Sequence, residues 1–268
     1  MMNRIERKFK ELKLQKKKAF IAYITAGDPS LSVTKRIALS LEGSGVDIIE
    51  LGVPFSDPIA DGPTIQAASH RALQKKVTLK KIFALVHDLR KTADIPIAFM
   101  TYYNPVLKYG VEKFVKSCKY NGVDGVIIPD LPYEEAEDLI RCAKREKVAT
   151  MFLAAPTSTR KRIKDIVKNS TGFIYYVSLT GVTGARRRLP AEVASNVRII
   201  KSMTRKPIAV GFGISSAGQA RSIARIADGV IVGSAIVKII AKYQGNEKML
   251  ISKVSSFLKR LAGAIHGA

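Results

Sequence analysis

The chain has 268 residues, of which 47% are hydrophobic and 25% are charged. This composition excludes a disordered or fibrous protein, and the length suits one α/β barrel as well as two small domains. The formal net charge of +23 is compatible with a nucleic-acid binder, but the basic residues are spread over predicted helices and loops without interleaved aromatic residues. The sequence therefore favours a compact protein with a solvated basic surface and predicts no nucleic-acid partner.

No targeting or membrane segment is visible in the sequence. Residues 1–18 lack the apolar core of a secretory signal, and the longest apolar stretches, such as residues 229–237, are too short to cross a bilayer. Cys118 and Cys142 lie in predicted helices and show neither metal-ligand nor redox spacing. We therefore expect a cytoplasmic protein with reduced thiols and no membrane association.

Short β-branched runs alternate with segments of helical periodicity along the chain. Before the first run, Ile5, Phe9 and Leu12 form one apolar stripe over residues 3–14, which predicts a helix that either closes one end of the fold or docks beside it. Several runs are apolar at consecutive positions, as expected for parallel strands covered on both faces. Eight runs are predicted to be strands: residues 19–24, 46–51, 95–100, 123–129, 148–154, 172–177, 207–212 and 227–233.

Eight strands alternating with helices match a closed (β/α)8 TIM barrel of the α/β class, with the extra N-terminal helix in addition. No linker or break in composition divides the chain, so residues 1–268 are predicted to form a single domain. In barrels of this kind the chemistry lies at the C-terminal ends of the strands. The loops that follow each run are therefore the places to look for a site.

The loops after the seventh and eighth runs favour phosphate binding. Residues 211–215 read GFGIS and residues 233–235 read GSA at the start of a predicted helix. Glycine lets the backbone approach an anion, and the free N–H groups of a helix N-terminus, with Ser234 as a further donor, complete a cradle. The alternative is that these glycines only form tight turns.

Glu50 ends the second run, where a carboxylate is costly unless it reaches the mouth of the barrel. It is either a proton carrier with a raised pKa or a solvated charge at the end of a strand. The following loop, residues 52–66, is stiffened by three prolines and positions Asp57 and Asp61. Asp61 either caps the next helix or accepts a hydrogen bond from a substrate N–H, and the spacing does not separate these interpretations.

A second long loop follows the sixth run. Residues 178–188 are glycine-rich and typical of a mobile lid that excludes water. Near the strand ends, apolar and aromatic side chains could line a pocket for a planar ligand, although each one singly is favoured to be core. These candidates are Tyr23, Met100, Ile127, Tyr175, Phe212 and Ile231.

No metal site is predicted. The three histidines have no ligand partners at metal spacing, and the sequence contains no nucleophile elbow, Walker loop or evident Schiff-base lysine at a strand end. The histidines are His70, His87 and His266.

Across nearly its whole length the sequence resembles the tryptophan synthase alpha subunit family. The resemblance is specific, because the stretch ELGVPFSDPIADGPTIQ combines two acids of the loop with three prolines in one pattern. Further matching stretches are AYITAGDPS, MTYYNP, VDGVIIPDLPYEE, LAAPTS, GFIYYVS with GVTG, VGFGIS and GVIVGSAIVK.

The resemblance implies a lyase of tryptophan biosynthesis that cleaves indole-3-glycerol phosphate to indole and glyceraldehyde 3-phosphate. It implies that Glu50 is the acid and base, that Asp61 holds the indole N–H, and that Tyr175 lies beside Glu50. The indole pocket would comprise Tyr23, Met100, Ile127, Phe212 and Ile231, Thr183 would close the lid, and the phosphate would be bound by Gly184, Gly213, Gly233 and Ser234.

The resemblance also implies a partner. In the family an α2β2 heterotetramer forms with a beta subunit that carries pyridoxal phosphate, so no cofactor is expected in this chain. Three other interpretations stay open: a catalytically weak barrel that mainly activates the beta subunit, a barrel acting on another sugar phosphate, and a nucleic-acid binder.

Overall fold

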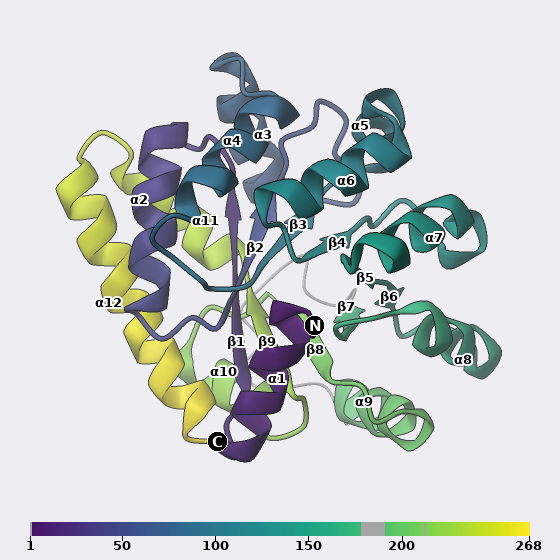
Figure 1. Cartoon of the computed structure of the whole chain (residues 1–268). Helices are drawn as coiled ribbons and strands as arrows, with labels where there is room; N and C mark the ends of the chain where they lie inside the picture. Colours follow the sequence, from purple (N-terminus) through teal and green to yellow (C-terminus); the bar gives the residue numbers. More distant parts are fainter. Residues whose placement is uncertain (1, 178–190, 212) are drawn as a thin grey trace.

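The computed structural model describes residues 2–177, 191–211 and 213–268. All strand pairs in it are parallel, and helices surround the strands, as Figure 1 shows. Each of the eight predicted runs contains a strand. The strands are β1 (Ala19–Thr25), β2 (Ile48–Gly52), β3 (Ile97–Met100), β4 (Gly125–Ile127), β5 (Ala149–Met151), β6 (Leu153–Ala154), β7 (Ile174–Val177), β8 (Ile208–Gly211) and β9 (Gly229–Val232).

The sheet closes on itself. Its order is β5-β4-β3-β2-β1-β9-β8-β7-β6, and both terminal strands belong to the single predicted run 148–154. The run is interrupted at Phe152, whose N–H donates to Ser170 Oγ (3.2 Å) while its carbonyl accepts from the N–H of Tyr175 (3.2 Å). The predicted (β/α)8 barrel is thus confirmed, with its fifth strand divided in two.

Helices cover the outside of the barrel, and several begin where a hydroxyl side chain caps them. Ser30, Thr78 and Thr159 each accept a hydrogen bond from a backbone N–H three residues further on. The helices after the first are α2 (Leu31–Glu42), α3 (Pro63–Gln74), α4 (Leu79–Leu89), α5 (Tyr103–Tyr109), α6 (Val111–Asn121), the 3-10 helix η1 (Tyr133–Glu135), α7 (Glu137–Glu146), α8 (Arg160–Asn169), α9 (Ala191–Met203), α10 (Ala217–Ala224), α11 (Ser234–Tyr243) and α12 (Glu247–His266). None of the helices in the described ranges is long and apolar enough to cross a membrane.

The strands separate two buried clusters. Alternate strand residues point outward and pack under the helices, while the others fill the barrel interior. The strand register places Tyr23 beside Glu50, and Glu50 in turn beside Ala98. Glu50 therefore belongs to a layer of interior side chains.

Helix α1 (Arg4–Leu14) closes the N-terminal end of the barrel, which decides between the two positions predicted for it. Its buried side chains Ile5, Phe9 and Leu12 join the interior cluster, and the Phe9 ring lies 5.7 Å from that of Phe173. Asn3 fixes the start of the helix, because its side-chain amide donates to the carbonyls of Asp124 and Lys147. With this end filled, access to the interior is from the C-terminal ends of the strands.

Candidate active site

Glu50 lies in the interior of the barrel with only 1% of its surface exposed. Within the described residues, its Oε2 atom has no hydrogen-bond partner. Burial, and then the negative charge of Asp61, raise the pKa of Glu50 from 4.5 to about 8. The side chain is therefore protonated at neutral pH, and its free oxygen is available to a ligand in the barrel mouth.

Asp61 is not the cap of the next helix. The N-cap of α3 is Gly62, without a side-chain hydrogen bond, and Pro63 is the first helical residue. The Asp61 carboxylate instead forms a hydrogen bond with the hydroxyl of Tyr102. Burial raises the pKa of Asp61 from 3.8 to about 6, although the bond to Tyr102 acts in the opposite direction. Asp61 is thus ionised at neutral pH, where Glu50 is not.

Tyr102 is a site residue that the sequence analysis missed. It is buried, and it contacts the loop between β2 and α3 at three points. Its ring lies 5.3 Å from that of Phe55, its hydroxyl accepts from the N–H of Ala60 (3.0 Å), and the same hydroxyl bonds to Asp61. The only sequence signal was its position in MTYYNP, directly after the third predicted strand.

Tyr23 and Tyr175 are buried in the electrostatic field of the two acids. Burial is the main cause of their raised pKa values, and the charges of Glu50 and Asp61 add to it in both residues. The Tyr23 hydroxyl lies 3.3 Å from Thr25 Oγ1. A Cβ atom on Gly52 would lie 2.2 Å from that hydroxyl, so the Tyr23 ring requires glycine at this position. Both phenols remain neutral and can act as hydrogen-bond donors.

The other predicted pocket residues differ in depth. Ile127 and Ile231 are buried in the interior cluster that also contains the stripe of α1. Met100 is partly exposed and packs against this cluster and against Tyr23. Ile127 and Ile231 thus belong to the core below the mouth, whereas Met100 and Tyr23 reach its wall.

The turns after β8 and β9 lie side by side, since the register pairs Gly211 with Ile231. Gly213 has a φ of +53°, a conformation that favours glycine. Gly233 is the N-cap of α11, and Ser234 is exposed at its first position. The first N–H groups of a helix have no partner within it, so this pair of turns has the chemistry of an anion site.

Three predicted site residues lie outside the described residues: Thr183 and Gly184 of the predicted lid, and Phe212 of the predicted pocket. In the described ranges, no group of three or more His, Cys, Asp or Glu side chains is arranged to hold a metal ion.

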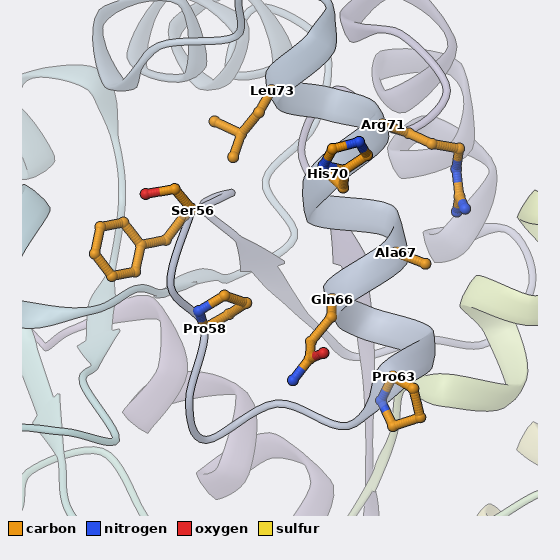
Figure 2. A pocket seen from close by; sticks show the side chains of 9 residues that line it. Ser56, Pro58, Pro63, Gln66, Ala67, His70, Arg71 and Leu73 are labelled. Atoms are coloured by element: carbon orange, nitrogen blue, oxygen red, sulfur yellow. The ribbon is translucent and has the colours of Figure 1, made fainter.

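A separate hollow of about 640 Å³ lies outside the barrel axis, between α3 and the loop that precedes it. Figure 2 shows Pro58 on the loop facing Gln66 and His70 on the helix. None of the residues that line it is a predicted site residue. It borders the loop that carries Asp61 but holds neither acid.

A closed parallel barrel with two carboxyl groups of different acidity toward the C-terminal ends of its strands has the architecture of a TIM-barrel enzyme. The sequence profile of the family described as "Tryptophan synthase alpha chain" matches residues 9–266. The chain belongs to this family. The family membership predicted from the sequence motifs is confirmed.

Relatives and solved structures match this chain over nearly its whole length. The tryptophan synthase alpha chain of Caldanaerobacter subterraneus subsp. tengcongensis is 50% identical over 97% of this chain and 98% of that protein, and the one of Geotalea daltonii is 49% identical over 98% and 99%. The structure of tryptophan synthase subunit alpha from Legionella pneumophila superposes with a TM-score of 0.92 at 35% identity, covering 99% of both chains. A chain of Mycobacterium tuberculosis tryptophan synthase gives 0.90, with the same identity and coverage.

Proposed function

We propose that this chain is a lyase that cleaves indole-3-glycerol phosphate to indole and glyceraldehyde 3-phosphate, the reaction of its family, with Glu50 and Asp61 as catalytic residues. The observation that carries these assignments is the difference in acidity between the two carboxyl groups. The pKa of Glu50 is about 8 and that of Asp61 about 6, so at neutral pH one is an acid and the other an anion. Such a separation marks residues with different roles in one reaction.

The proposed reaction uses one proton, which Glu50 donates and later recovers. Glu50 donates its proton to the indole ring carbon that bears the glycerol chain, and positive charge develops on the ring nitrogen. Asp61 accepts the ring N–H and stabilises this charge. The Glu50 carboxylate then removes the proton from the adjacent glycerol hydroxyl, the carbon–carbon bond breaks, and its electron pair returns to the ring as the aldehyde forms. Glu50 ends protonated, ready for another cycle.

The remaining residues would bind the substrate. Tyr175 would support Glu50, since both are buried and interact electrostatically. Tyr23 and Met100 would line the indole pocket together with Phe212, above the core residues Ile127 and Ile231. The phosphate would be held by Gly213, Gly233 and Ser234, with Gly184 from the loop that Thr183 closes.

The direct test is indole release from indole-3-glycerol phosphate by Glu50→Gln. Loss of general acid–base catalysis typically lowers rates by about 10² to 10⁴-fold, and we expect kcat to fall by that order while the fold is retained. Circular dichroism and thermal unfolding would verify the fold. If the variant kept the rate of the unchanged protein, the assignment of Glu50 would be wrong.

The same assay separates the alternatives. A barrel specific for another sugar phosphate would leave indole-3-glycerol phosphate uncleaved. A subunit that only activates its partner would release no indole, either alone or in complex, but would still raise the activity of the beta subunit on mixing. The presence of both acids in the geometry described favours the lyase.

We further propose that the chain is a single domain that acts in the cytoplasm within an α2β2 complex. The pyridoxal phosphate of that complex would belong to the beta subunit. In support, no lysine lies in any described strand of this barrel, so the described strands offer no amine for a Schiff base.

A further inference from the structure

A hollow of about 300 Å³ lies at the N-terminal end of the barrel, at the opposite end from Glu50 and Asp61. The end of α1 forms one side of it, and the segments that lead into β8 and β9 form the other. Among the described residues that line it, five are basic and one, Asp228, is acidic. The basic residues are Lys13, Lys16, Lys17, Lys18 and Arg205.

The single acid is already engaged. Asp228 Oδ2 accepts from the N–H of Ile208 (3.1 Å), and Oδ1 pairs with Lys201 at 3.1 Å and more loosely with Lys18 at 3.9 Å. The other four cations, Lys13, Lys16, Lys17 and Arg205, form no side-chain hydrogen bond or ion pair with any residue that the structure describes. Four unpaired positive charges therefore converge on one hollow.

The backbone holds these charges in place. Lys16 has a φ of +55°, and the turn is closed by two hydrogen bonds, from Lys16 N–H to the Lys13 carbonyl (3.1 Å) and from Lys17 N–H to the Leu12 carbonyl (2.8 Å). Leu12 and Phe9 anchor the turn from below, because both are buried in the barrel interior. The turn fixes the backbone positions of Lys16 and Lys17 at this end of the barrel, and a bound anion would relieve the repulsion between their positive charges.

We propose that this hollow binds a small multivalent anion of the polyphosphate class, either inorganic triphosphate or the triphosphate of a nucleotide. Lys and Arg are the usual ligands of phosphate oxygens. The volume lies at the lower end of the range for small-molecule sites, which admits a triphosphate chain and excludes a nucleic-acid duplex. The site is separate from the anion site near Gly233, which lies at the other end of the strands.

The test is calorimetric titration of the full chain with sodium tripolyphosphate. The double variant Lys16→Gln/Arg205→Gln removes two charges from the hollow. Its matched control, Lys253→Gln/Lys259→Gln, removes two exposed charges of α12 that form no ion pair with any residue the structure describes. We expect one tripolyphosphate per chain, at least about tenfold weaker binding in the hollow variant, and less than about twofold change in the control. Equal weakening in both variants would show a diffuse attraction and overturn the proposal.

Two further measurements locate the anion and its source. Unchanged binding in the hollow variant would place tripolyphosphate at the turns near Gly233 and would also overturn the proposal. ATP that binds at least as tightly as tripolyphosphate, with the same sensitivity to Lys16→Gln/Arg205→Gln, would assign a nucleotide, and weaker binding of ATP would assign the inorganic ion. A single-stranded oligonucleotide that binds more tightly than either, and equally to both variants, would indicate a nucleic-acid surface instead.

Discussion

At the scale of single residues, Glu50 and Asp61 interact electrostatically but ionise about two pKa units apart. Glu50 is deeper and also feels the charge of Asp61, whereas Asp61 receives a hydrogen bond from Tyr102. Asp61 therefore raises the pKa of Glu50, while burial and Tyr102 determine the pKa of Asp61. The proposed reaction needs Asp61 ionised and Glu50 protonated at its start.

This requirement predicts a bell-shaped dependence of kcat/KM on pH. Activity should rise with pH through about 6, as Asp61 loses its proton, and fall above about 8, as Glu50 loses its own. In Asp61→Asn the acidic limb should disappear. The alkaline limb should move to lower pH, because the charge that helps to raise the pKa of Glu50 is gone. Residual activity of this variant, measured between pH 5 and 10, would reveal both effects, and an unchanged alkaline limb would contradict the coupling.

Tyr102→Phe should change the acidic limb of the same pH profile. The hydroxyl lowers the pKa of Asp61 and accepts from Ala60, so its removal should shift the acidic limb to higher pH. Loss of one hydrogen bond to a charged group predicts a decrease in kcat/KM of about tenfold. Tyr103→Phe is the matched control, since among the described residues its hydroxyl has no hydrogen-bond partner. Equal effects of the two variants would argue against a positioning role of Tyr102.

Sequence reasoning reached the two acids and not this tyrosine for a physical reason. Glu50 is conspicuous as a charge within an apolar strand, and Asp61 lies in a loop stiffened by prolines. Tyr102 looks like any aromatic residue after a strand, and its role depends on a contact with a segment about forty residues earlier in the chain. The interpretation of Asp61 as a helix cap was wrong because Gly62 takes that position.

At the scale of elements, the stripe of α1 fills the end of the barrel. Phe9→Ala would leave a cavity beside Phe173 and should lower the free energy of unfolding by about 3 kcal/mol. The corresponding decrease in midpoint temperature is roughly 6 °C for a chain of this size. Leu14→Ala, on the same helix but 78% exposed, should change stability by less than about 0.5 kcal/mol. Similar midpoints for the two variants would show that the packing of Phe9 adds little to the stability of the barrel.

Periodicity predicted the elements better than it predicted their interruptions. All eight strand runs and the N-terminal helix were confirmed, because burial on both faces leaves continuous apolar runs and burial on one face leaves a stripe. The break at Phe152 depends on Ser170, which lies in a different segment. Such breaks arise from packing between segments and leave no local pattern.

At the scale of the whole molecule, the two ends of the barrel carry different surfaces. The C-terminal end holds the acids, and two exposed apolar side chains lie on segments that follow strands there: Ile59, 75% exposed, and Leu107 of α5, 58% exposed. Isolated exposed apolar residues are ordinary. Ile59, however, lies on the loop before α3 and Leu107 lies on α5, and Tyr102, the N-cap of α5, bonds to that loop at Ala60. This surface is the one that the proposed beta subunit would cover.

Leu107→Asp therefore tests the orientation of the complex. A buried charge at the centre of an interface should weaken binding of the beta subunit by more than about tenfold, measured by calorimetry or analytical ultracentrifugation. Tyr120→Asp is the matched control, because Tyr120 is 79% exposed but lies near the end of α6, toward the N-terminal ends of the strands. We expect its affinity to stay within about twofold of the unchanged protein. Indole release by each variant alone should also be preserved, since neither side chain contacts Glu50 or Asp61. The reverse result, with Tyr120→Asp the weaker binder, would place the partner at the N-terminal end of the barrel, where it would cover the basic hollow rather than the site.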